Sequence, residues 1–501
     1  MRLTALQFSV NQCTMRPIMD SYNNKTMGTC RNVMRALLFH TALVAAAVIV
    51  LNGCTTGPGY VRPSAPAPAE FKEAVGWKPA QPSANLPRGE WWILFGDEEL
   101  NALEAQVGIS NQTLQVAEAR VRQAQALSQQ ARTAFFPRVS GTASATRSRS
   151  ASETRNNFNL GLNANWEPDL WGRVRRTVEA GEANVDASVA DLEAAKLAAQ
   201  AELAQDYLLL RVQDAVIALL QESVAGYERS LQLTRNQFNV GVVARLDVVQ
   251  AEAQLKSTQA QAIDAGVQRA QLEHAIAVLV GKPPAELSLA SVPVRRVFPD
   301  IPVALPSELL ERRPDIAAAE RRVAAANAQV GVAAAAFFPS LTLSAAGGFQ
   351  SSILSNLLSL PHLYWSLGPA LAQTLFDAGL RRAQSAQALA VYDQSVATYR
   401  QTVLNSFQEV EDNLATLRIL AQEADVQEDA INAARQTVAI TTNQYRAGIT
   451  SYLAVVVAQA ALLGNERTAI NLLGRRLTAS VALIKALGGG WHDTDLAQAM
   501  P

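Results

Sequence analysis

Cysteine is the residue type whose chemistry is most clearly directed by its neighbours in this chain of 501 residues. Cys54 follows the letters LNG at the end of an apolar run, and a small residue directly before such a cysteine marks the site where exported lipoproteins are cleaved and acylated. The Asn in this pattern is unusual. We predict that Cys54 is the lipid-modified N-terminus of the mature chain; the alternative is an ordinary export signal followed by an idle thiol. Cys13 and Cys30 precede it, so no disulfide framework can cross-link the rest of the chain.

The segment before Cys54 has the order of an export signal. Arg35 is followed by an uncharged apolar stretch over residues 36–51, which is too short to cross a bilayer comfortably as a helix. Residues 1–33 match no class of targeting signal, so Met34 is a candidate for the true start. Because one acyl chain holds a protein only weakly, firm attachment requires several chains on Cys54 or a second membrane-embedded element.

The other chemistry-bearing residues form no catalytic or ligand-binding pattern. His40, His274, His362 and His492 lack the paired spacing of metal ligands, and no thiol is left over as a ligand. The GKPP at Gly281 lacks the spacing of a phosphate loop, and no serine occupies a nucleophile elbow. A formal net charge of -1 gives no basic excess for nucleic acid. We therefore expect no enzymatic activity, no cofactor, no metal and no nucleic-acid partner.

The elements that must carry the function occur twice along the chain. The letters AFFP end an alanine-rich run at 134–137 and again at 336–339, and NQFNVGVVARLDVVQAEAQL at 236–255 resembles NQYRAGITSYLAVVVAQAALL at 443–463. The offset moves only from 202 to 207 residues, which is far longer than the repeat of a solenoid. Each half is predicted to contain a helix that stops at its AFFP proline, two alternating stretches, a very long helix, a Gly-centred turn and a returning helix.

The long helices are predicted from proline-free stretches with coiled-coil periodicity. No proline occurs between Pro168 and Pro283 or between Pro369 and Pro501. Apolar residues fall seven apart in the first half and step by four and three in the second: Leu203, Leu210, Ile217, Val224 and Leu231, then Val403, Phe407, Val410, Leu414, Leu417, Ala421 and Ala424. A single helix over 171–235 would be roughly 100 Å long. The abundant alanines favour a curved wall of helices; a solvated two-helix hairpin is the alternative.

The alternating stretches are typical of strands that face lipid on one side. Apolar residues alternate with polar ones at Phe158, Leu160, Leu162, Ala164 and Trp166 in the first half and at Leu341, Leu343, Leu363, Trp365 and Leu367 in the second; residues 138–147 form the fourth stretch. About ten alternating residues with an aromatic near the end is the texture of an outer-membrane strand. A small soluble sheet that caps the helices is the alternative, but two matched hairpins on an exported, lipidated chain favour the membrane.

Four strands cannot close a barrel, and an open sheet edge is not tolerated in lipid because its backbone groups would be unpaired. Several subunits must therefore share one barrel. Two copies would supply eight strands and three would supply twelve, and a polar, water-filled interior favours the larger number. We expect a homotrimer. The predicted fold class is thus mainly α with a membrane β part: a long α-helical (coiled-coil) barrel plus a β-barrel of four strands per protomer, twelve in a trimer, built from an internal tandem repeat.

Several motifs resemble those of the outer-membrane efflux protein (TolC-like) family, in its lipoprotein branch that serves resistance-nodulation-division drug pumps. They are GPGYVRP after Cys54, WWILFGDEEL, WEPDLWGRVRR, LPSELLERRPDI before the second AFFP, and KALGGGW near the C-terminus. The resemblance covers essentially residues 54–491. It implies a trimeric duct in the outer membrane, anchored through Cys54 and projecting into the periplasm. Such a duct docks through its helical tips onto a periplasmic adaptor (membrane fusion) protein and an inner-membrane pump, and passively conducts drugs or other small molecules outward.

A wide duct must narrow somewhere, and the turns 238–247 and 445–457 are expected to form its periplasmic tip. In the family this tip carries aspartate rings and a polar latch between the halves. The resemblance places the latch on Asp247 and Tyr445, with Thr450 where a basic partner is usual and Ala454 and Val457 where aspartates are usual; Arg245 is an alternative latch residue. Because Leu453 to Val457 are all apolar, we expect a constriction that closes by dewetting. The alternative is that these residues only pack the helix pair.

The predicted domains are a leader (1–53), a lipidated Pro-rich tether (54–90), a first repeat (91–290, with a β-hairpin at about 138–167), a linker (291–314), a second repeat (315–488, with a β-hairpin at about 340–370) and a tail (489–501). Two other functions compete with the duct. A structural coiled-coil lipoprotein without a pore would leave the apolar strand faces uncovered, and an adaptor would carry one helical hairpin instead of a twofold repeat.

Overall fold

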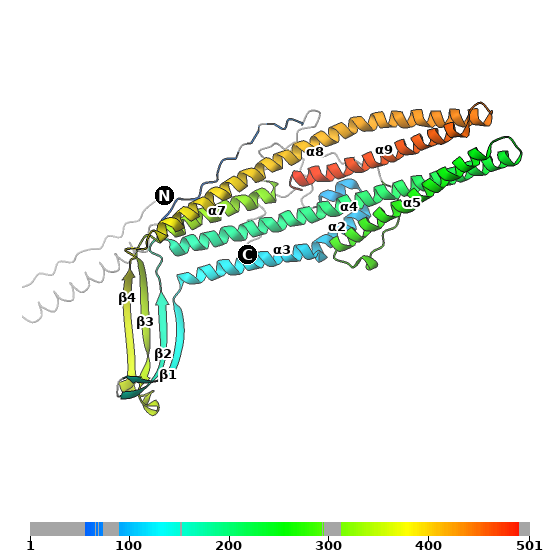
Figure 1. Cartoon of the computed structure of the whole chain (residues 1–501). Coiled ribbons are helices and arrows are strands. Elements are labelled where there is room, and N and C mark those ends of the chain that lie inside the picture. The colour runs from blue at the N-terminus through cyan, green and yellow to red at the C-terminus, as the bar shows by residue number, and fades with distance from the viewer. Residues whose placement is uncertain are drawn as a thin grey trace, which may run out of the picture.

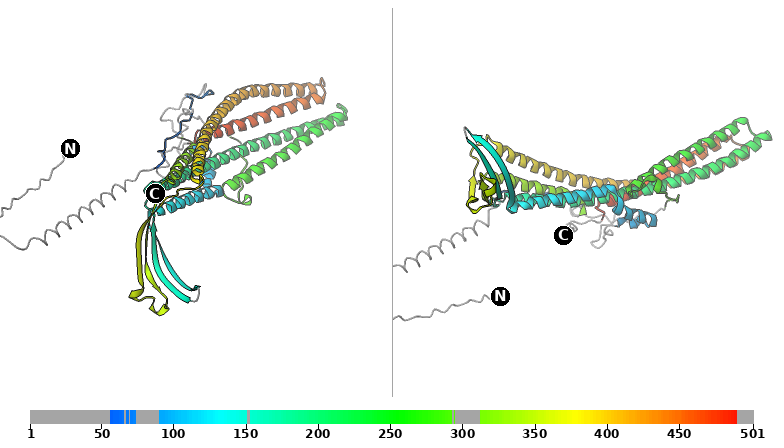
Figure 2. Two further views of the ribbon diagram at one scale, coloured as in Figure 1. Left: turned by 60° about the vertical axis from the view of Figure 1, so that its left-hand side comes forward. Right: turned by 90° about the horizontal axis from the view of Figure 1, so that it is seen from below.

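The computed structural model describes residues 56–65, 67–68, 70–73, 90–150, 153–292, 294 and 312–489. The leader, Cys54 and most of the tether, of the linker between the halves and of the C-terminal tail lie outside these ranges. The helices lie side by side in one long body, and four strands form a sheet that projects from one end of it (Figure 1). The opposite end of the body narrows to two helical hairpins (Figure 2).

The two halves contain matching elements. The first half contains η1 (Trp91–Phe95), α2 (Glu98–Ser110), α3 (Gln112–Arg132), β1 (Arg138–Ser150), β2 (Glu153–Trp166), α4 (Arg173–Asn239) and α5 (Arg245–Leu279). The second half contains α7 (Pro314–Ala335), β3 (Ser340–Ser351), β4 (Leu363–Ala372), α8 (Leu380–Arg446) and α9 (Tyr452–Ala486). Four short 3-10 turns complete the described elements: η2 (Thr133–Phe135), η3 (Pro284–Glu286), η4 (Leu354–Asn356) and η5 (Leu360–His362). The predicted tandem repeat is confirmed, because α4 and α8 have 67 residues each and α5 and α9 have 35 each.

The helix before each AFFP ends as predicted. α3 passes into the short η2 turn and α7 ends at Ala335, and the strands β1 and β3 begin directly after Pro137 and Pro339. One difference lies upstream, where the first half has two helices, α2 and α3, with a break at Asn111. The Asn111 side chain accepts a hydrogen bond from the Leu114 amide (3.1 Å) and donates one to the Leu279 carbonyl (2.8 Å). It therefore begins a new helix and ties it to the end of α5.

The predicted long helix over 171–235 is observed as α4, and its 67 residues correspond to a length of about 100 Å. Gly172, with φ 81°, precedes it, and the Asp169 carboxylate accepts hydrogen bonds from the amides of Val174 and Arg175, both 2.9 Å. Asp169 thus accepts hydrogen bonds from two amides of the first turn of α4, which have no carbonyl partner within the helix. Most of the predicted seam is buried: Leu203, Leu210, Leu231, Val403, Phe407, Val410, Leu414 and Leu417. Ile217, Val224, Ala421 and Ala424 are half-buried.

The sheet is antiparallel with the order β1-β2-β3-β4, so β1 and β4 are edge strands and β2 and β3 join the two halves. Its register pairs Ala145 with Phe158, Leu160 with Phe349, and Gly347 with Trp365. The observed strands are longer than the predicted alternating stretches, because β1 and β2 continue to Ser150 and Glu153 at the end of their hairpin, β3 continues to Ser351 and β4 continues to Ala372.

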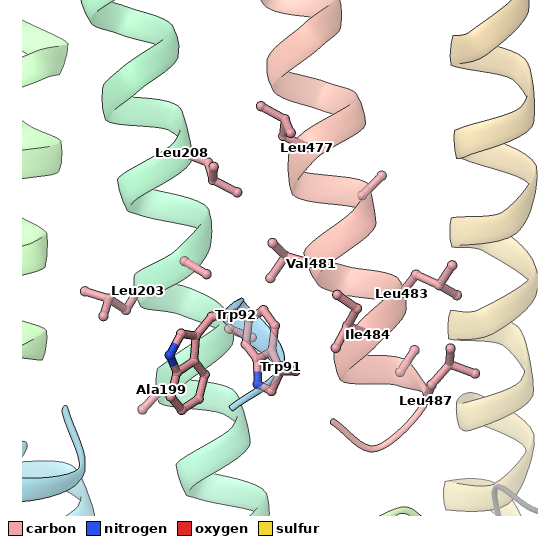
Figure 3. Packing of buried hydrophobic residues seen from close by; sticks show 14 of the residues in the cluster. Trp91, Trp92, Ala199, Leu203, Leu208, Leu477, Val481, Leu483, Ile484 and Leu487 are labelled. Atoms are coloured by element: carbon pink, nitrogen blue, oxygen red, sulfur yellow. The ribbon is translucent and has the colours of Figure 1, made fainter. Parts of the chain in front are cut away.

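The hydrophobic core lies in the middle of the helical body, far from the sheet. Figure 3 shows Trp91 and Trp92 of η1 between α4 and α9, close to Leu203 and Ile484. Trp91 has no exposed surface, and it makes edge-to-face contacts with the rings of Trp92 and Phe95. The WWILF segment therefore packs between α4 of the first half and α9 of the second, and this contact helps to hold the two halves together. None of the helices in the described ranges is both long enough and apolar enough to cross a membrane.

Candidate functional site: a two-faced sheet and an apolar helical tip

One face of the sheet is apolar across all four strands. Residues that are directly paired in an antiparallel sheet share a face, so the register alone assigns them. The apolar face collects every strand residue singled out from the sequence, together with small residues of β1: Phe158, Leu160, Leu162, Ala164, Trp166, Leu341, Leu343, Leu363, Trp365, Leu367, Val139, Ala143 and Ala145. Many of these side chains are exposed in the single chain, as for Leu367 at 76% and Trp365 at 78%. A continuous exposed apolar face marks an interaction surface.

The opposite face of the sheet is polar and is cross-linked by side-chain hydrogen bonds. Asn159 Nδ2 donates to the Tyr364 hydroxyl (3.3 Å), Gln350 Nε2 donates to Asn157 Oδ1 (3.0 Å), and Asn163 Nδ2 donates to Thr142 Oγ1 (3.4 Å). These bonds connect β1 to β2, β2 to β3, and β2 to β4 across the intervening Gly161 and Gly348. Asn, Ser, Thr and Gln side chains of this kind suit contact with water, so the two faces have opposite solvent preferences.

Aromatic residues gather where the sheet meets the helices. Phe136 and Phe376 are exposed, and the Trp171 ring stacks on Phe338 at 4.9 Å between ring centroids. Trp171 Nε1 donates to the Pro339 carbonyl (2.6 Å), and Trp166 Nε1 donates to the Phe135 carbonyl (3.0 Å). An aromatic belt with satisfied polar atoms is typical of a membrane–water boundary. Sequence reasoning used AFFP only as a helix stop and missed this role, although the repeated Phe pair was the available signal.

The first described residues of the chain are fixed at the same level as this belt. The Thr56 amide and hydroxyl both donate to the Trp171 carbonyl, at 3.2 and 2.8 Å. Arg176 is buried, and its guanidinium donates to the carbonyls of Thr56 (3.3 Å), Gly57 (3.3 Å) and Pro58 (3.0 Å). Gly57 lies against Gly331 of α7 so closely that a Cβ on Gly57 would be 2.6 Å from the Gly331 Cα. The GPGYVRP motif is therefore a docking segment that binds α4 and α7.

At the far end of the body, an aromatic pair joins the two helical hairpins. Tyr445 and Tyr452 contact each other edge-to-face at 5.2 Å between ring centroids. The Tyr445 hydroxyl donates to Gln237 Oε1 (3.0 Å), and the Tyr452 hydroxyl lies 2.9 Å from the Ser230 hydroxyl, so both bonds cross from the second half to α4. Burial raises the pKa of both tyrosines, and the negative charge of Asp247 adds to the increase. Both hydroxyls therefore stay protonated at physiological pH.

The structure separates the predicted gate residues into two groups. Val455 is only 2% exposed and packs with Tyr227, Leu231 and Tyr452, so it belongs to the helix packing. Leu453 and Val457 are 52% and 60% exposed and lie one helical turn apart on the same face of α9. Ala454, Val456 and Thr450 are half-buried. The apolar stretch from Leu453 to Val457 thus serves packing at one position and leaves two apolar side chains uncovered.

The polar latch candidates do not bond directly to each other within one chain. Tyr445 bonds to Gln237, while the side chains of the half-buried Asp247 and the exposed Arg245 form no hydrogen bond or ion pair with any residue in the described ranges. Gln237 is the hydrogen-bond partner of Tyr445 across the two halves, and the sequence analysis did not single it out. Its signal was the repeated NQ at 236–237 and 443–444, which precedes the tip turn in both halves.

A buried ionic network lies between the sheet and the tip. Asp214 accepts hydrogen bonds from Arg211 (3.1 Å) and Arg269 (2.6 Å), and these arginines also donate to the carbonyls of Ala290 (2.5 Å) and Leu289 (2.6 Å). The network fixes the chain after α5 onto α4 and α5, so we assign it a structural role. No group of three or more metal-ligating side chains occurs within the part of the chain that the structure describes.

Comparison with known proteins places this architecture in a known group. A family model described as outer membrane efflux protein matches residues 105–282 and 305–489. The toluene efflux pump outer membrane protein TtgC of Pseudomonas putida is 32% identical over 463 residues, which cover 90% of this chain and 95% of TtgC. The cation efflux system protein CusC of Escherichia coli is 29% identical over 451 residues, covering 89% of this chain and 97% of CusC. The structure of the outer-membrane channel OprN superposes with a TM-score of 0.82 at 33% identity, covering 87% of this chain and 100% of OprN.

Proposed function

The chain belongs to the outer membrane efflux protein family, and from this premise we propose that it is the passive exit duct of a tripartite efflux system, assembled as a homotrimer. The single observation that carries the proposal is the two-faced sheet with two unpaired edges. Its apolar face suits lipid, its polar face suits a water-filled lumen, and β1 and β4 both lack a partner on one side. Chains that pair β4 with the β1 of a neighbour close the cylinder and leave no edge in lipid.

Three chains give a barrel of twelve strands, and the long helices continue this barrel into the periplasm. The number three follows from the polar face: eight strands leave an interior that side chains fill, whereas more strands leave room for water. In this arrangement the duct performs no chemistry. Energy comes from an inner-membrane pump of the resistance-nodulation-division type, joined to the duct by a periplasmic adaptor that docks on the helical tips.

Purified protein from outer-membrane extracts tests the duct directly. We expect a heat-resistant trimer on gels and stepwise conductance in planar lipid bilayers. A monomer without conductance would instead favour a structural coiled-coil lipoprotein, the competing function. The named relatives include a toluene efflux component and a cation efflux component, so we assign the choice of exported compound to the pump.

We further propose that Cys54 carries lipid in the inner leaflet of the outer membrane. Thr56 is fixed on Trp171, in the aromatic belt, and two residues of chain reach at most about 7 Å. An acyl group on Cys54 would therefore be within reach of the level where the acyl chains of the membrane begin. Mass spectrometry of the mature protein should find an acylated N-terminus at residue 54, and a Cys54→Ser variant should lose that mass. An unmodified chain that begins before residue 54 would contradict the proposal.

We also propose that Leu453 and Val457 line an apolar constriction at the periplasmic tip. Polar substitution should let water into such a constriction, so Leu453→Ser and Val457→Ser should each raise the conductance of the closed channel severalfold. Val426→Ser, at an exposed position on the body of α8, is the matched control and should leave the conductance unchanged. Equal behaviour of all three variants would remove Leu453 and Val457 from the gate.

The latch between the hairpins is proposed to involve Tyr445, Gln237 and Asp247, with Arg245 and Thr450 in supporting positions. A variant with both Asp247→Ala and Tyr445→Ala loses the Tyr445–Gln237 bond and the buried ring, so it should open more readily. Single-channel recording measures this directly. An unchanged closed-state conductance would remove both residues from the gate.

A further inference from the structure

Two arginines continue the apolar face of the sheet beyond its last apolar row. Arg147 is paired with Asn156 and Arg149 with Thr154, two and four residues past the pair formed by Ala145 and Phe158. Because side chains alternate along a strand, both arginines lie on the same face as Phe158 and Leu160. This end of the sheet is the one remote from the helical body (Figure 1).

These two guanidinium groups have no partner among the residues that the structure describes. Arg147 and Arg149 are both exposed, and neither side chain forms a hydrogen bond or an ion pair with any residue in the described ranges. Arg155 provides the contrast, since it lies at the same end of the sheet on the polar face and is paired with Glu153, with Nε 2.9 Å from the carboxylate. The basic residue on the polar face, Arg155, thus has an acidic partner. The two basic residues on the apolar face, Arg147 and Arg149, have none in the described ranges.

The depth of the two arginines fits the boundary of the hydrocarbon layer. From Leu341 to Phe349 the apolar face extends over nine residues of β3, whose eight intervals measure about 27 Å along the strand and about 20 Å along the membrane normal for a strand tilted by about 40°. An outer-membrane barrel has an apolar band about 25 Å tall. An arginine on the lipid face is strongly unfavourable at the midplane and costs almost nothing at the interface, so a position just past the band favours contact with the headgroups.

We propose that Arg147 and Arg149 bind the phosphate of an outer-leaflet lipid headgroup. A guanidinium group binds phosphate through two parallel hydrogen bonds, and two arginines at i and i+2 of one strand lie about 7 Å apart, close enough to hold one phosphorylated headgroup between them. This inference rests on the proposed duct, because the apolar face must contact lipid. The proposal adds a specific contact with a lipid headgroup to an apolar face that would otherwise contact only acyl chains.

Binding of a defined lipid to the assembled channel tests the site. The probe is bisphosphorylated lipid A added to purified trimer in detergent, with bound lipid counted by native mass spectrometry. Loss of both charges in an Arg147→Ser/Arg149→Ser variant should weaken binding about ten- to thirtyfold, since each basic residue at an anionic surface contributes about 1 kcal/mol. Lipid A stripped of phosphate should bind the unsubstituted channel as weakly as phosphorylated lipid A binds the double variant.

Arg155→Ser is the matched control at the same end of the sheet, and it should bind the phosphorylated lipid normally. An Arg147→Lys/Arg149→Lys variant keeps the charge but loses the bidentate geometry, so its binding should be intermediate; it also serves if the serine variant does not assemble. Normal binding by the serine variant, an equal loss in Arg155→Ser, or no effect of phosphate removal would each overturn the proposal. A channel that conducts but shows one of these results refutes only this inference, whereas absence of trimer and conductance in the unsubstituted protein refutes the duct.

Discussion

Glu104 on α2 shows how much a single residue in this body is controlled by burial. Its side chain is 1% exposed, and neither carboxylate oxygen has a hydrogen-bond partner within the described residues. Burial raises the pKa of Glu104 to about 9, so the folded protein holds it as the neutral acid at physiological pH. A carboxylic acid kept in this state contributes most to stability at low pH.

The sign of the pH effect follows from the raised pKa. Between the ordinary glutamate pKa and about 9, the folded chain retains a proton that the unfolded chain has lost, so stability falls as pH rises through this window. Glu104→Gln removes the ionisation, and we expect its stability advantage over the unsubstituted protein to grow with pH by up to about 1.4 kcal/mol per pH unit. Thermal unfolding followed by the helical circular-dichroism signal from pH 5 to pH 9 measures it.

Glu118→Gln is the control for this prediction. Glu118 is exposed on α3 and forms only a long surface ion pair with Arg122 (3.9 Å), so its removal should change the melting temperature little at any pH. A Glu104→Gln variant with the same pH profile as the unsubstituted protein would show that Glu104 is hydrogen-bonded or solvated in the assembled molecule.

At the scale of elements, glycines mark the joints of the repeat. The glycines with positive φ at the starts and ends of the long helices fall in pairs 207 residues apart: Gly172 and Gly379, Gly241 and Gly448, Gly281 and Gly488. The third pair also sits against a carbonyl, since a Cβ would lie 2.2 Å from the Ser110 oxygen at Gly281 and 2.1 Å from the Arg312 oxygen at Gly488. In both halves, therefore, the end of the returning helix is pressed against the start of the helix that leads to the sheet.

Alanine at these joints should separate backbone strain from steric clash. Gly448→Ala places a side chain at φ 73° in open space, so we expect a loss of only about 1 kcal/mol. Gly488→Ala adds a clash with a backbone carbonyl that cannot move away, so we expect a loss of about 3 kcal/mol or more. Chemical denaturation of the two variants under the same conditions ranks them. Similar stabilities would show that the C-terminal end of α9 relaxes away from Arg312.

At the scale of the whole molecule, the two faces of the sheet decide assembly. Leu367 and Ser366 are neighbours on β4, and the pairing of Leu367 with Ala345 places it near the middle of the apolar face while Ser366 lies on the polar one. Leu367→Arg should cost about 2–4 kcal/mol per chain in the lipid layer and abolish the heat-resistant trimer. Ser366→Arg should leave the trimer intact and shift the ion selectivity of the channel toward anions.

Gel mobility with and without heating, together with reversal potentials in a salt gradient, measures both outcomes of this pair of variants. Trimer loss in Ser366→Arg with normal assembly of Leu367→Arg would mean that the faces are assigned the wrong way round. Equal effects would mean that the sheet does not separate lipid from water.

The sequence predicted the large features of this protein because each is written in a pattern of the chain itself. The twofold repeat follows from matching segments 202 to 207 residues apart, and the stop at each AFFP, the long helices and the alternating strands follow from proline positions and apolar spacing. The family resemblance carried by motifs such as WEPDLWGRVRR agrees with the match to outer membrane efflux proteins. Local pattern also picked out the apolar strand residues from Phe158 to Leu367 that share one face. The lipid on Cys54 and the apolar gate remain predictions.

Other features were decided only by tertiary structure, because they depend on which distant residues meet. Three hydrogen bonds are examples, each between residues more than 100 positions apart: Asn111 with Leu279, Thr56 with Trp171, and Tyr445 with Gln237. A local period in the sequence does not indicate which distant residue will be the partner. Strand pairing likewise decided that four alternating stretches present a single apolar face with Arg147 and Arg149 at its rim. Periodicity fixes which side of an element is apolar, whereas only the register between elements fixes what that side contacts.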